Sequence, residues 1–119
     1  MANPFVHVEL NTQDLPKAKE FYSKLFDWKL EDLPAPMEYT LIKVGEGTAG
    51  GIMKHPMPGQ PSFWLAYVGV DDIKASTGKA RSLGANLIKD VTEIPNVGWF
   101  SIFMDPTGAA LALFQAKTQ

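Results

Sequence analysis

The feature that most constrains this chain is an internal repeat with a spacing of 58 residues. Residues 7–30 align with residues 65–88, and in both copies a short apolar strand leads to an aspartate, a helix and a second strand. Asp14 falls on Asp72 in this alignment. Few positions are identical, so the shared pattern carries the argument. Two copies of one structural unit commonly pack against each other, which predicts a ligand site between them.

Each repeat is predicted to contain a strand, a helix and three further strands. Alternation over residues 5–11 predicts a first strand with two unlike faces. Val6, Val8 and Leu10 form its apolar face, and Phe5, His7, Glu9 and Asn11 form the other. Asp14 is the predicted N-cap of a helix that ends near Phe26. Asp71 or Asp72 caps the second helix, and Gly84 follows its end.

The remaining strands are predicted from short apolar runs that are separated by turn residues. They cover residues 28–31, 38–44, 49–54, 63–69, 86–92, 99–104 and 109–115. Residues 33–36 are predicted to form a loop, and residues 105–108 a hairpin turn. We expect the apolar face of the first strand to pack against Phe21 and Leu25 of the first helix. Trp28 and Trp64 are interpreted as core residues.

Length and composition indicate a single globular domain at residues 1–119, with modules at about 1–55 and 61–119. The net charge of -2, with scattered Lys and Arg, argues against nucleic-acid binding. The chain has no cysteine, which excludes disulfides, thiolate zinc sites and a cysteine nucleophile. No signal peptide or membrane-spanning run is recognised, so we expect a cytoplasmic protein without membrane contact.

Three stretches together resemble the vicinal oxygen chelate superfamily, which includes glyoxalase I, bleomycin-resistance proteins and extradiol dioxygenases. They read HVELNTQDLPKAKEFYSKLFDW, VGVDDIKASTGKARSLGANL and FMDPTGAALALFQ, and they span almost the whole chain. The resemblance implies an α+β fold of two βαβββ modules. It also implies that the sheets form a cleft or partial barrel, with the helices outside and the ligand in the cleft.

Metal-dependent members of that superfamily hold a divalent ion with two side chains from each module. The resemblance places these positions at His7, Gly51, Leu65 and Ala112. Only His7 carries a side chain that binds metals, whereas a catalytic site needs about three protein ligands. We therefore expect no metal and no other cofactor.

The residues expected to contact a small ligand lie on the predicted cleft face of the strands. They are His7, Glu9, Gly51, Leu65, Tyr67, Trp99, Ala112 and Phe114. Gly51 and Ala112 leave space there, and Trp99 and Phe114 are expected to wall it. His7, beside Glu9, is also the candidate catalytic acid or base. His55 lies in the connector at residues 55–61 and is interpreted as a loop residue.

Three functions remain open. The favoured hypothesis is a small-molecule-binding protein that works without metal chemistry. The first alternative is an enzyme, either a lyase or isomerase that uses His7 or a metal enzyme whose ligands lie elsewhere. The second alternative is an interaction module without a ligand. Members of this length commonly pair, so we expect a homodimer.

Overall fold

The structure, a computed structural model, describes residues 2–34 and 38–117. Part of the predicted loop at residues 33–36 therefore lies outside the described residues. Within them the chain forms two compact units: residues 7–65, and residues 66–117 together with residues 2–6. The boundary falls inside two strands rather than in the connector at residues 55–61. The prediction of one domain stays a prediction.

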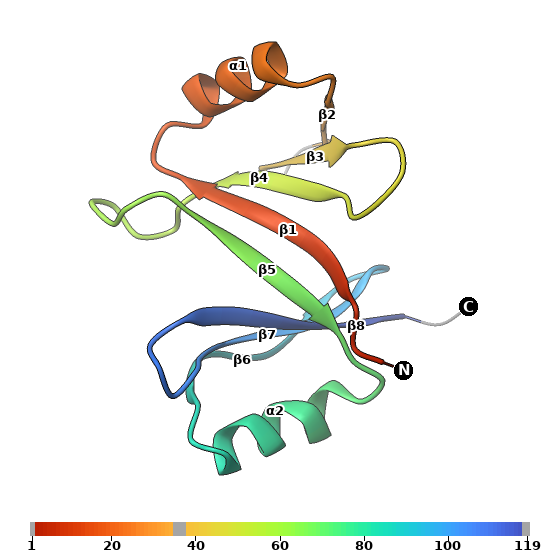
Figure 1. The fold of residues 1–119 in the computed structure, drawn as a ribbon, viewed down its shortest axis with the longest axis vertical. Coiled ribbons are helices and arrows are strands. Elements are labelled where there is room, and N and C mark those ends of the chain that lie inside the picture. The colour runs from red at the N-terminus through yellow and green to blue at the C-terminus, as the bar shows by residue number, and fades with distance from the viewer. Residues whose placement is uncertain (1, 35–37, 118–119) are drawn as a thin grey trace. The chain divides into compact units, whose positions relative to one another are not determined.

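The N-terminal unit, residues 7–65, contains the first helix and the first four strands (Figure 1). These elements are β1 (Phe5–Thr12), α1 (Leu15–Leu25), β2 (Lys29–Asp32), β3 (Tyr39–Lys43) and β4 (Gly50–Lys54). The strands are ordered β2-β3-β4-β1. β1 runs parallel to β4, from the pair Val8 and Gly50 to the pair Thr12 and Lys54, and the other neighbours are antiparallel.

The C-terminal unit, residues 2–6 and 66–117, repeats this plan. Its elements are β5 (Phe63–Gly69), α2 (Ile73–Ser82), β6 (Asn86–Ile94), β7 (Gly98–Met104) and β8 (Ala110–Ala116). The strands are ordered β5-β8-β7-β6, and only the β5–β8 pair is parallel. The predicted α+β fold of two βαβββ modules is confirmed, with each strand within about two residues of its predicted limits.

The strand ends explain the boundary between the units. The N–H of Gly69, the last residue of β5, donates to the carbonyl of Pro4 at 2.8 Å. The Asn3 side chain donates to the Gly69 carbonyl at 2.9 Å. Residues 2–6 are thereby tied to the C-terminal unit. Residues 63–65 at the start of β5 belong to the N-terminal unit.

Both helices begin at the predicted aspartates. Asp14 Oδ1 accepts from the Lys17 N–H at 3.1 Å, and Asp72 Oδ1 accepts from the Ala75 N–H at the same distance. These bonds satisfy amide groups that the first turn leaves unpaired. α2 ends before Gly84, whose φ of +105° suits a residue without a side chain. The predicted roles of these residues in capping are confirmed.

The packing of α1 differs from the prediction. Leu10 packs with Ile42 and Ile52, and Leu15, Ala18 and Tyr22 cover this cluster. Phe21 and Leu25, the expected partners of β1, are 57% and 54% exposed. The prediction of a contact with them was wrong, because only a narrow stripe along α1 meets the sheet. Val6 is also exposed and belongs to the other unit.

The two tryptophans near α1 form an aromatic cluster with the helix. The Tyr22 ring stacks on Trp28, with centroids 5.7 Å apart, and meets the Trp64 ring edge-on at 5.5 Å. Trp28 packs against the core, as expected, whereas Trp64 keeps 39% of its surface exposed. With Phe21, Leu25 and Phe26, this side of the N-terminal unit carries an exposed apolar surface.

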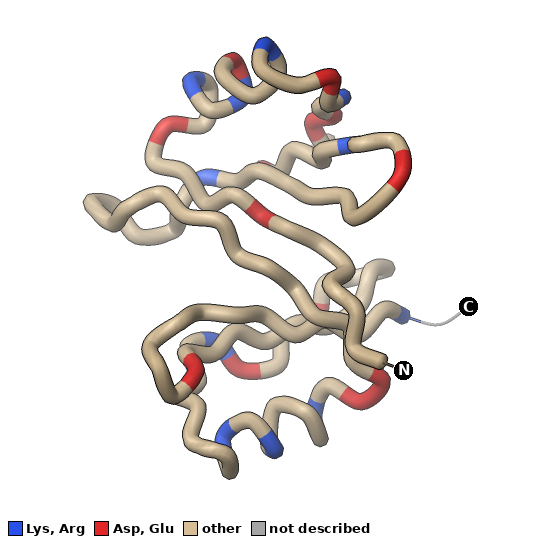
Figure 2. Tube along the Cα trace, in the orientation of Figure 1, with Lys and Arg blue, Asp and Glu red and all other residues tan. Residues whose placement is uncertain are grey.

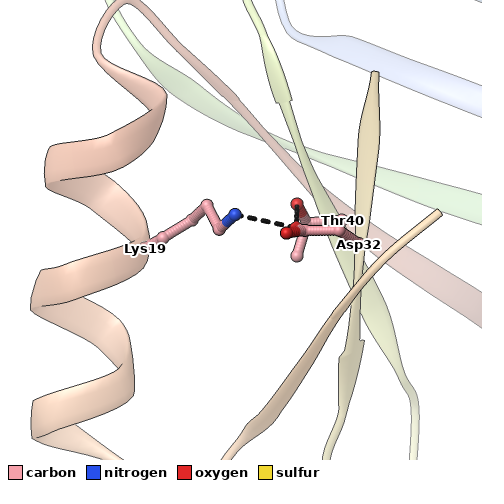
Figure 3. Close-up of polar contacts among 3 residues, drawn as sticks. All are labelled: Lys19, Asp32 and Thr40. Atoms are coloured by element: carbon pink, nitrogen blue, oxygen red, sulfur yellow. Dashed lines mark hydrogen bonds and ion pairs between the residues drawn. The ribbon is translucent and has the colours of Figure 1, made fainter. Parts of the chain in front are cut away.

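A polar contact on the surface holds α1 to the strands (Figure 3). Asp32 Oδ1 accepts from Lys19 Nζ and from Thr40 Oγ1, each at 2.7 Å. The hydrogen bond from Lys19, followed by that from Thr40, lowers the pKa of the Asp32 carboxyl. Asp32 is exposed, so we expect this contact to orient α1 more than to stabilise the fold.

The charged residues of the chain are dispersed. Figure 2 shows Lys and Arg on both helices and at several strand ends, with acidic residues between them. Charges of both signs are therefore interspersed along the described residues. No helix among the described residues has the length and apolar character required to cross a bilayer.

Candidate functional site

The polar face of β1 is the strongest candidate for a site. The alternation of the strand sends Leu10 toward α1 and sends His7, Glu9 and Asn11 to the opposite face. Glu9 is 7% exposed and Asn11 is 6% exposed. Buried polar side chains need partners to offset the loss of water. Three polar side chains on one strand face are therefore expected to form a network.

Tyr39 on β3 completes that network. Gly51 pairs with Glu9 on one side of β4 and with Leu41 on the other. The phenol of Tyr39 lies over Gly51, because a Cβ atom built there would stand only 2.0 Å from Tyr39 Oη. Only glycine fits at position 51, because any side chain there would displace the Tyr39 hydroxyl.

The side chains form a continuous chain of hydrogen bonds. His7 Nε2 lies 2.7 Å from Tyr39 Oη. The Tyr39 hydroxyl donates to Glu9 Oε2 at 2.9 Å, and Asn11 Nδ2 donates to Glu9 Oε1 at 3.3 Å. The expected proximity of His7 and Glu9 is realised through the Tyr39 hydroxyl. We call these four residues the Tyr39 network.

The environment of His7 favours an uncharged ring. Partial burial lowers the pKa of His7 below the ordinary value for histidine, because the imidazolium form loses solvation. A histidine that is neutral at physiological pH can accept a proton from a ligand. The expected acid–base role of His7 is chemically feasible on this ground.

The four positions that the family resemblance assigns to metal ligands do not fit a metal ion. His7 is hydrogen-bonded to Tyr39, and the space over Gly51 is filled by the same residue. Leu65 and Ala112 are buried apolar residues. Across residues 2–34 and 38–117, no three His, Cys, Asp or Glu side chains gather as metal ligands would. The expectation that Gly51 leaves an open space was wrong.

The C-terminal unit carries a different set of side chains on the corresponding face. Tyr67 pairs with Ala112, and Phe100 pairs with Phe114. The rings of Tyr67 and Phe100 are 6.5 Å apart. Tyr67 and Ala112 are buried, with 8% and 0% of their surfaces exposed. This face is apolar and aromatic, as the sequence predicted.

Trp99 lies on the other side of this sheet. It packs beside Val70 and Leu113 and beside Ile73 of α2. Because neighbouring residues of a strand alternate, Trp99 and Phe100 point in opposite directions. The expectation that Trp99 walls the same space as Phe114 was therefore wrong. Lys117 Nζ lies 5.3 Å from the centre of the Trp99 ring and forms an ion pair with Glu93.

Trp99 instead borders an open hollow of about 410 Å³ beside the start of α2. The lining residues are Asp71, Asp72, Ile73, Lys74, Val91, Trp99 and Gln115. Gln115 Oε1 accepts from the Ile73 N–H at 2.8 Å, so the amide group caps the helix.

His55 is a loop residue, as expected, and its Nδ1 accepts from the Met57 N–H at 3.0 Å.

Sequence reasoning missed Tyr39. It is the second residue of the predicted strand at residues 38–44, and its sequence neighbours carry no sign of a buried phenol. The adjacent glycines Gly50 and Gly51 were the available signal, because paired glycines in a strand indicate close approach by another group. They do not identify that group. Asn11 was placed on the correct face by its alternation with His7 and Glu9.

Comparisons with known proteins agree with this architecture. Residues 5–113 match the family model described as the glyoxalase/bleomycin resistance protein/dioxygenase superfamily. The protein CFP32 of Mycobacterium tuberculosis, whose name marks it as a candidate glyoxylase, is 36% identical over 88 residues. That match covers 74% of this chain and 34% of CFP32.

Two further proteins are similar at lower identity. The anthracycline biosynthesis protein DnrV of Streptomyces peucetius is 24% identical, with 90% of this chain and 45% of that protein covered. The chain thus spans between a third and a half of the length of these two curated relatives. The methylmalonyl-CoA epimerase of Mycobacterium tuberculosis has the same fold, with a TM-score of 0.70 at 17% identity. The superposition covers 96% of this chain and 88% of the epimerase.

Proposed function

The chain belongs to the glyoxalase/bleomycin resistance protein/dioxygenase superfamily, and on that premise we propose that it binds a small molecule without using a metal ion. The observation that carries the proposal is the Tyr39 phenol over Gly51. A hydroxyl group bound to His7 and Glu9 stands where the family resemblance places a metal-ligating side chain. The local chemistry is hydrogen bonding rather than coordination.

The proposed ligand is an aromatic small molecule with hydrogen-bonding oxygen atoms. Polar groups of the Tyr39 network would anchor it on the N-terminal unit. In the C-terminal unit, taken by itself, the apolar face of Tyr67, Ala112 and Phe114 is a second proposed contact surface for an apolar ligand. Leu65 is proposed as an apolar contact, whereas Gly51 is covered by the Tyr39 phenol. The names of the superfamily and of the Streptomyces relative, which mention bleomycin and anthracycline biosynthesis, support a ligand of this type.

An enzymatic function is the second candidate. A lyase or isomerase in which His7 removes or returns a proton is supported by the lowered pKa of His7. Tyr39 would hold the imidazole, and Glu9 would stabilise the imidazolium that forms. The name of the mycobacterial relative supports the same alternative.

We also propose that two copies of the chain assemble. The exposed Phe21, Leu25, Phe26 and Trp64 form an apolar surface that a monomer leaves in water. Sedimentation at low micromolar concentration tests assembly, and a folded 13.1 kDa monomer would contradict it.

A cytoplasmic location is proposed from the lack of cysteine.

Metal content tests the central proposal. Purified protein should hold no stoichiometric divalent ion by elemental analysis, and EDTA should leave its melting temperature unchanged. A tightly bound ion would stabilise the folded state by several kcal/mol at saturation. A fall of several degrees with EDTA that is absent in His7→Ala would contradict the metal-free function.

Ligand binding tests the site itself. We would titrate EDTA-treated protein with an anthracycline and with bleomycin, and identify co-purified molecules by native mass spectrometry. His7→Gln should weaken binding by about tenfold or more, because a hydrogen bond in the network is lost. His55→Gln is the matched control and should bind as the wild type does. Turnover of a bound molecule that stops in His7→Gln would favour the enzymatic alternative.

A further inference from the structure

We propose that Tyr39 is a positioning residue that fixes which nitrogen of His7 carries the proton. The proposal is that His7 is held as the Nε2–H tautomer, with its lone pair on Nδ1. It rests on the proposed function only in taking His7 as the residue that meets the ligand. All four residues of the Tyr39 network lie in the N-terminal unit.

The hydrogens available along the Tyr39 network determine the tautomer of His7. Tyr39 has a single hydroxyl hydrogen, which it donates to Glu9 Oε2 at 2.9 Å. Tyr39 Oη can then act only as an acceptor toward His7 Nε2, which lies 2.7 Å away. The short Nε2–Oη contact requires a hydrogen between the two atoms. That hydrogen must therefore belong to His7 Nε2.

The other end of the network sets the direction of these bonds. Asn11 Nδ2 donates to Glu9 Oε1, so Glu9 receives one hydrogen on each carboxylate oxygen. The proposal takes Glu9 as ionised, and an ionised carboxylate has no hydrogen to give back. The order of donation is consequently His7 to Tyr39 to Glu9. Hydrogen bonds that end on a charged acceptor are stronger than neutral ones, which favours this order over its reverse.

Gly51 makes the arrangement possible. A Cβ atom there would meet Oη at 2.0 Å and two Tyr39 ring carbons at 2.2 and 2.3 Å. The phenol can reach His7 and Glu9 together only over a residue without a side chain. Gly51 and Tyr39 therefore act as a pair. A methyl group at position 51 should disturb His7 although it does not touch the imidazole.

The consequence concerns the chemistry that His7 can perform. With hydrogen on Nε2, His7 accepts a proton or a hydrogen bond through Nδ1 alone. A ligand group that meets Nδ1 must therefore be a donor, such as a hydroxyl or an enol. A carbonyl oxygen or a carboxylate at the same place would face a lone pair and be disfavoured. Tyr39 would thus influence ligand choice without contacting the ligand.

Nitrogen NMR of protein labelled with 15N-histidine tests the inference without any ligand. The chain has two histidines, and His7→Gln assigns the signals. In the wild type, Nε2 of His7 should show the shift of a protonated ring nitrogen and Nδ1 that of an unprotonated one. His55 is an internal reference for the same tautomer, because its Nδ1 accepts from Met57.

Tyr39→Phe keeps the ring and removes the hydroxyl. The preference for Nε2–H at His7 should fall by about tenfold or more, the effect expected for loss of a hydrogen bond in a charged network. Gly51→Ala should shift the same signals by displacing the hydroxyl. Tyr22→Phe, in the aromatic cluster on the α1 side of the sheet, is the matched control and should leave His7 unchanged.

The wild-type spectrum alone can overturn the inference. A predominant Nδ1–H form, or equal amounts of both tautomers, would do so even if the variants failed to fold. An unchanged His7 spectrum in folded Tyr39→Phe would also contradict it. Failure of the binding experiments would leave the NMR result intact, so the tautomer and the proposed function are tested separately.

Discussion

The two units differ most on the sheet faces that point away from their helices. Three polar residues of β1 correspond, by the spacing of 58 residues, to three uncharged residues of β5: His7 to Leu65, Glu9 to Tyr67 and Asn11 to Gly69. The scaffold is shared, because both units have the same strand order and an aspartate-capped helix. A repeat can therefore preserve its architecture while one copy keeps a polar network and the other becomes apolar.

The two helices differ in how many of their side chains are buried. α1 has no buried residue, whereas α2 buries Ile73 and Thr77. Thr77 Oγ1 lies 2.8 Å from Ser101 Oγ beneath the helix. The unit with the polar network thus has the more exposed helix. We infer that α2 contributes more to the stability of its unit than α1 does.

The largest expected effect tests this difference in burial. Ile73→Ala should lower the free energy of unfolding by about 2–5 kcal/mol, because a buried side chain leaves a cavity. Leu15, its counterpart by the 58-residue spacing, is only partly buried, and Leu15→Ala should cost less. Urea denaturation measures both. Leu83→Ala, at a site 69% exposed and outside the proposed assembly surface, is the control and should cost under about 1 kcal/mol. Equal losses at residues 15 and 73 would remove the distinction between the helices.

The next effect concerns the buried hydroxyl pair under α2. Thr77→Val should destabilise by about 1–3 kcal/mol, since it leaves the Ser101 hydroxyl without its partner in a buried place. Combining it with Ser101→Ala should recover most of the loss, because neither polar group then remains. A double-mutant cycle by chemical denaturation measures this coupling. Strictly additive losses would show that the two hydroxyls act independently.

A smaller effect of opposite sign is expected in the same helix. Gly78 lies inside α2, and a Cβ atom there would meet nothing within 4 Å. Gly78→Ala should raise the free energy of unfolding by about 1 kcal/mol, because alanine has the higher helix propensity. Thermal and urea denaturation should agree on the gain. A loss of stability would indicate that the exposed side of α2 is occupied in solution.

The stability of the protein should depend on pH through His7, which belongs to the polar network of the N-terminal unit. Burial places the pKa of His7 below its unfolded value of about 6.5, so the folded state binds fewer protons than the unfolded state in that range. The contribution of His7 is fully present above about pH 6.5 and is lost as pH falls through the folded pKa. His7→Gln should show a shallower loss of stability on acidification below about pH 6.5. Identical pH profiles would mean that His7 is solvated like a surface residue.

The sequence predicted the scaffold well because the signals involved are local. Alternating residues reveal a strand, and Asp14 and Asp72 mark helix starts through a bond to an amide three residues later. The inward face of α1 was harder to predict. Tyr22 and Phe21 are adjacent aromatics, and only the packing with Trp28 and Trp64 decides which of them is covered.

The candidate site was only partly predictable because it depends on pairs distant in sequence. His7 and Glu9 were found from their shared strand face. Tyr39 lies 32 residues beyond His7, and no local pattern brings its hydroxyl there. Trp99 was predicted on the wrong face of the sheet for a related reason. The face on which a residue lies depends on the register of its strand. Shifting the assumed face by one residue reverses every side chain.

The exchange of strand ends between the units affects how the chain can fold as it is synthesised. Every residue of the unit at 7–65 has been made once Leu65 is added, so this unit can fold while the rest is still being translated. Residues 2–6 are made before this unit, yet they belong with residues 66–117. They must therefore wait for residues 66–117 before they can pack. A segment fused directly before residue 2 should consequently perturb the C-terminal unit, although residue 7 of the N-terminal unit follows closely in the sequence.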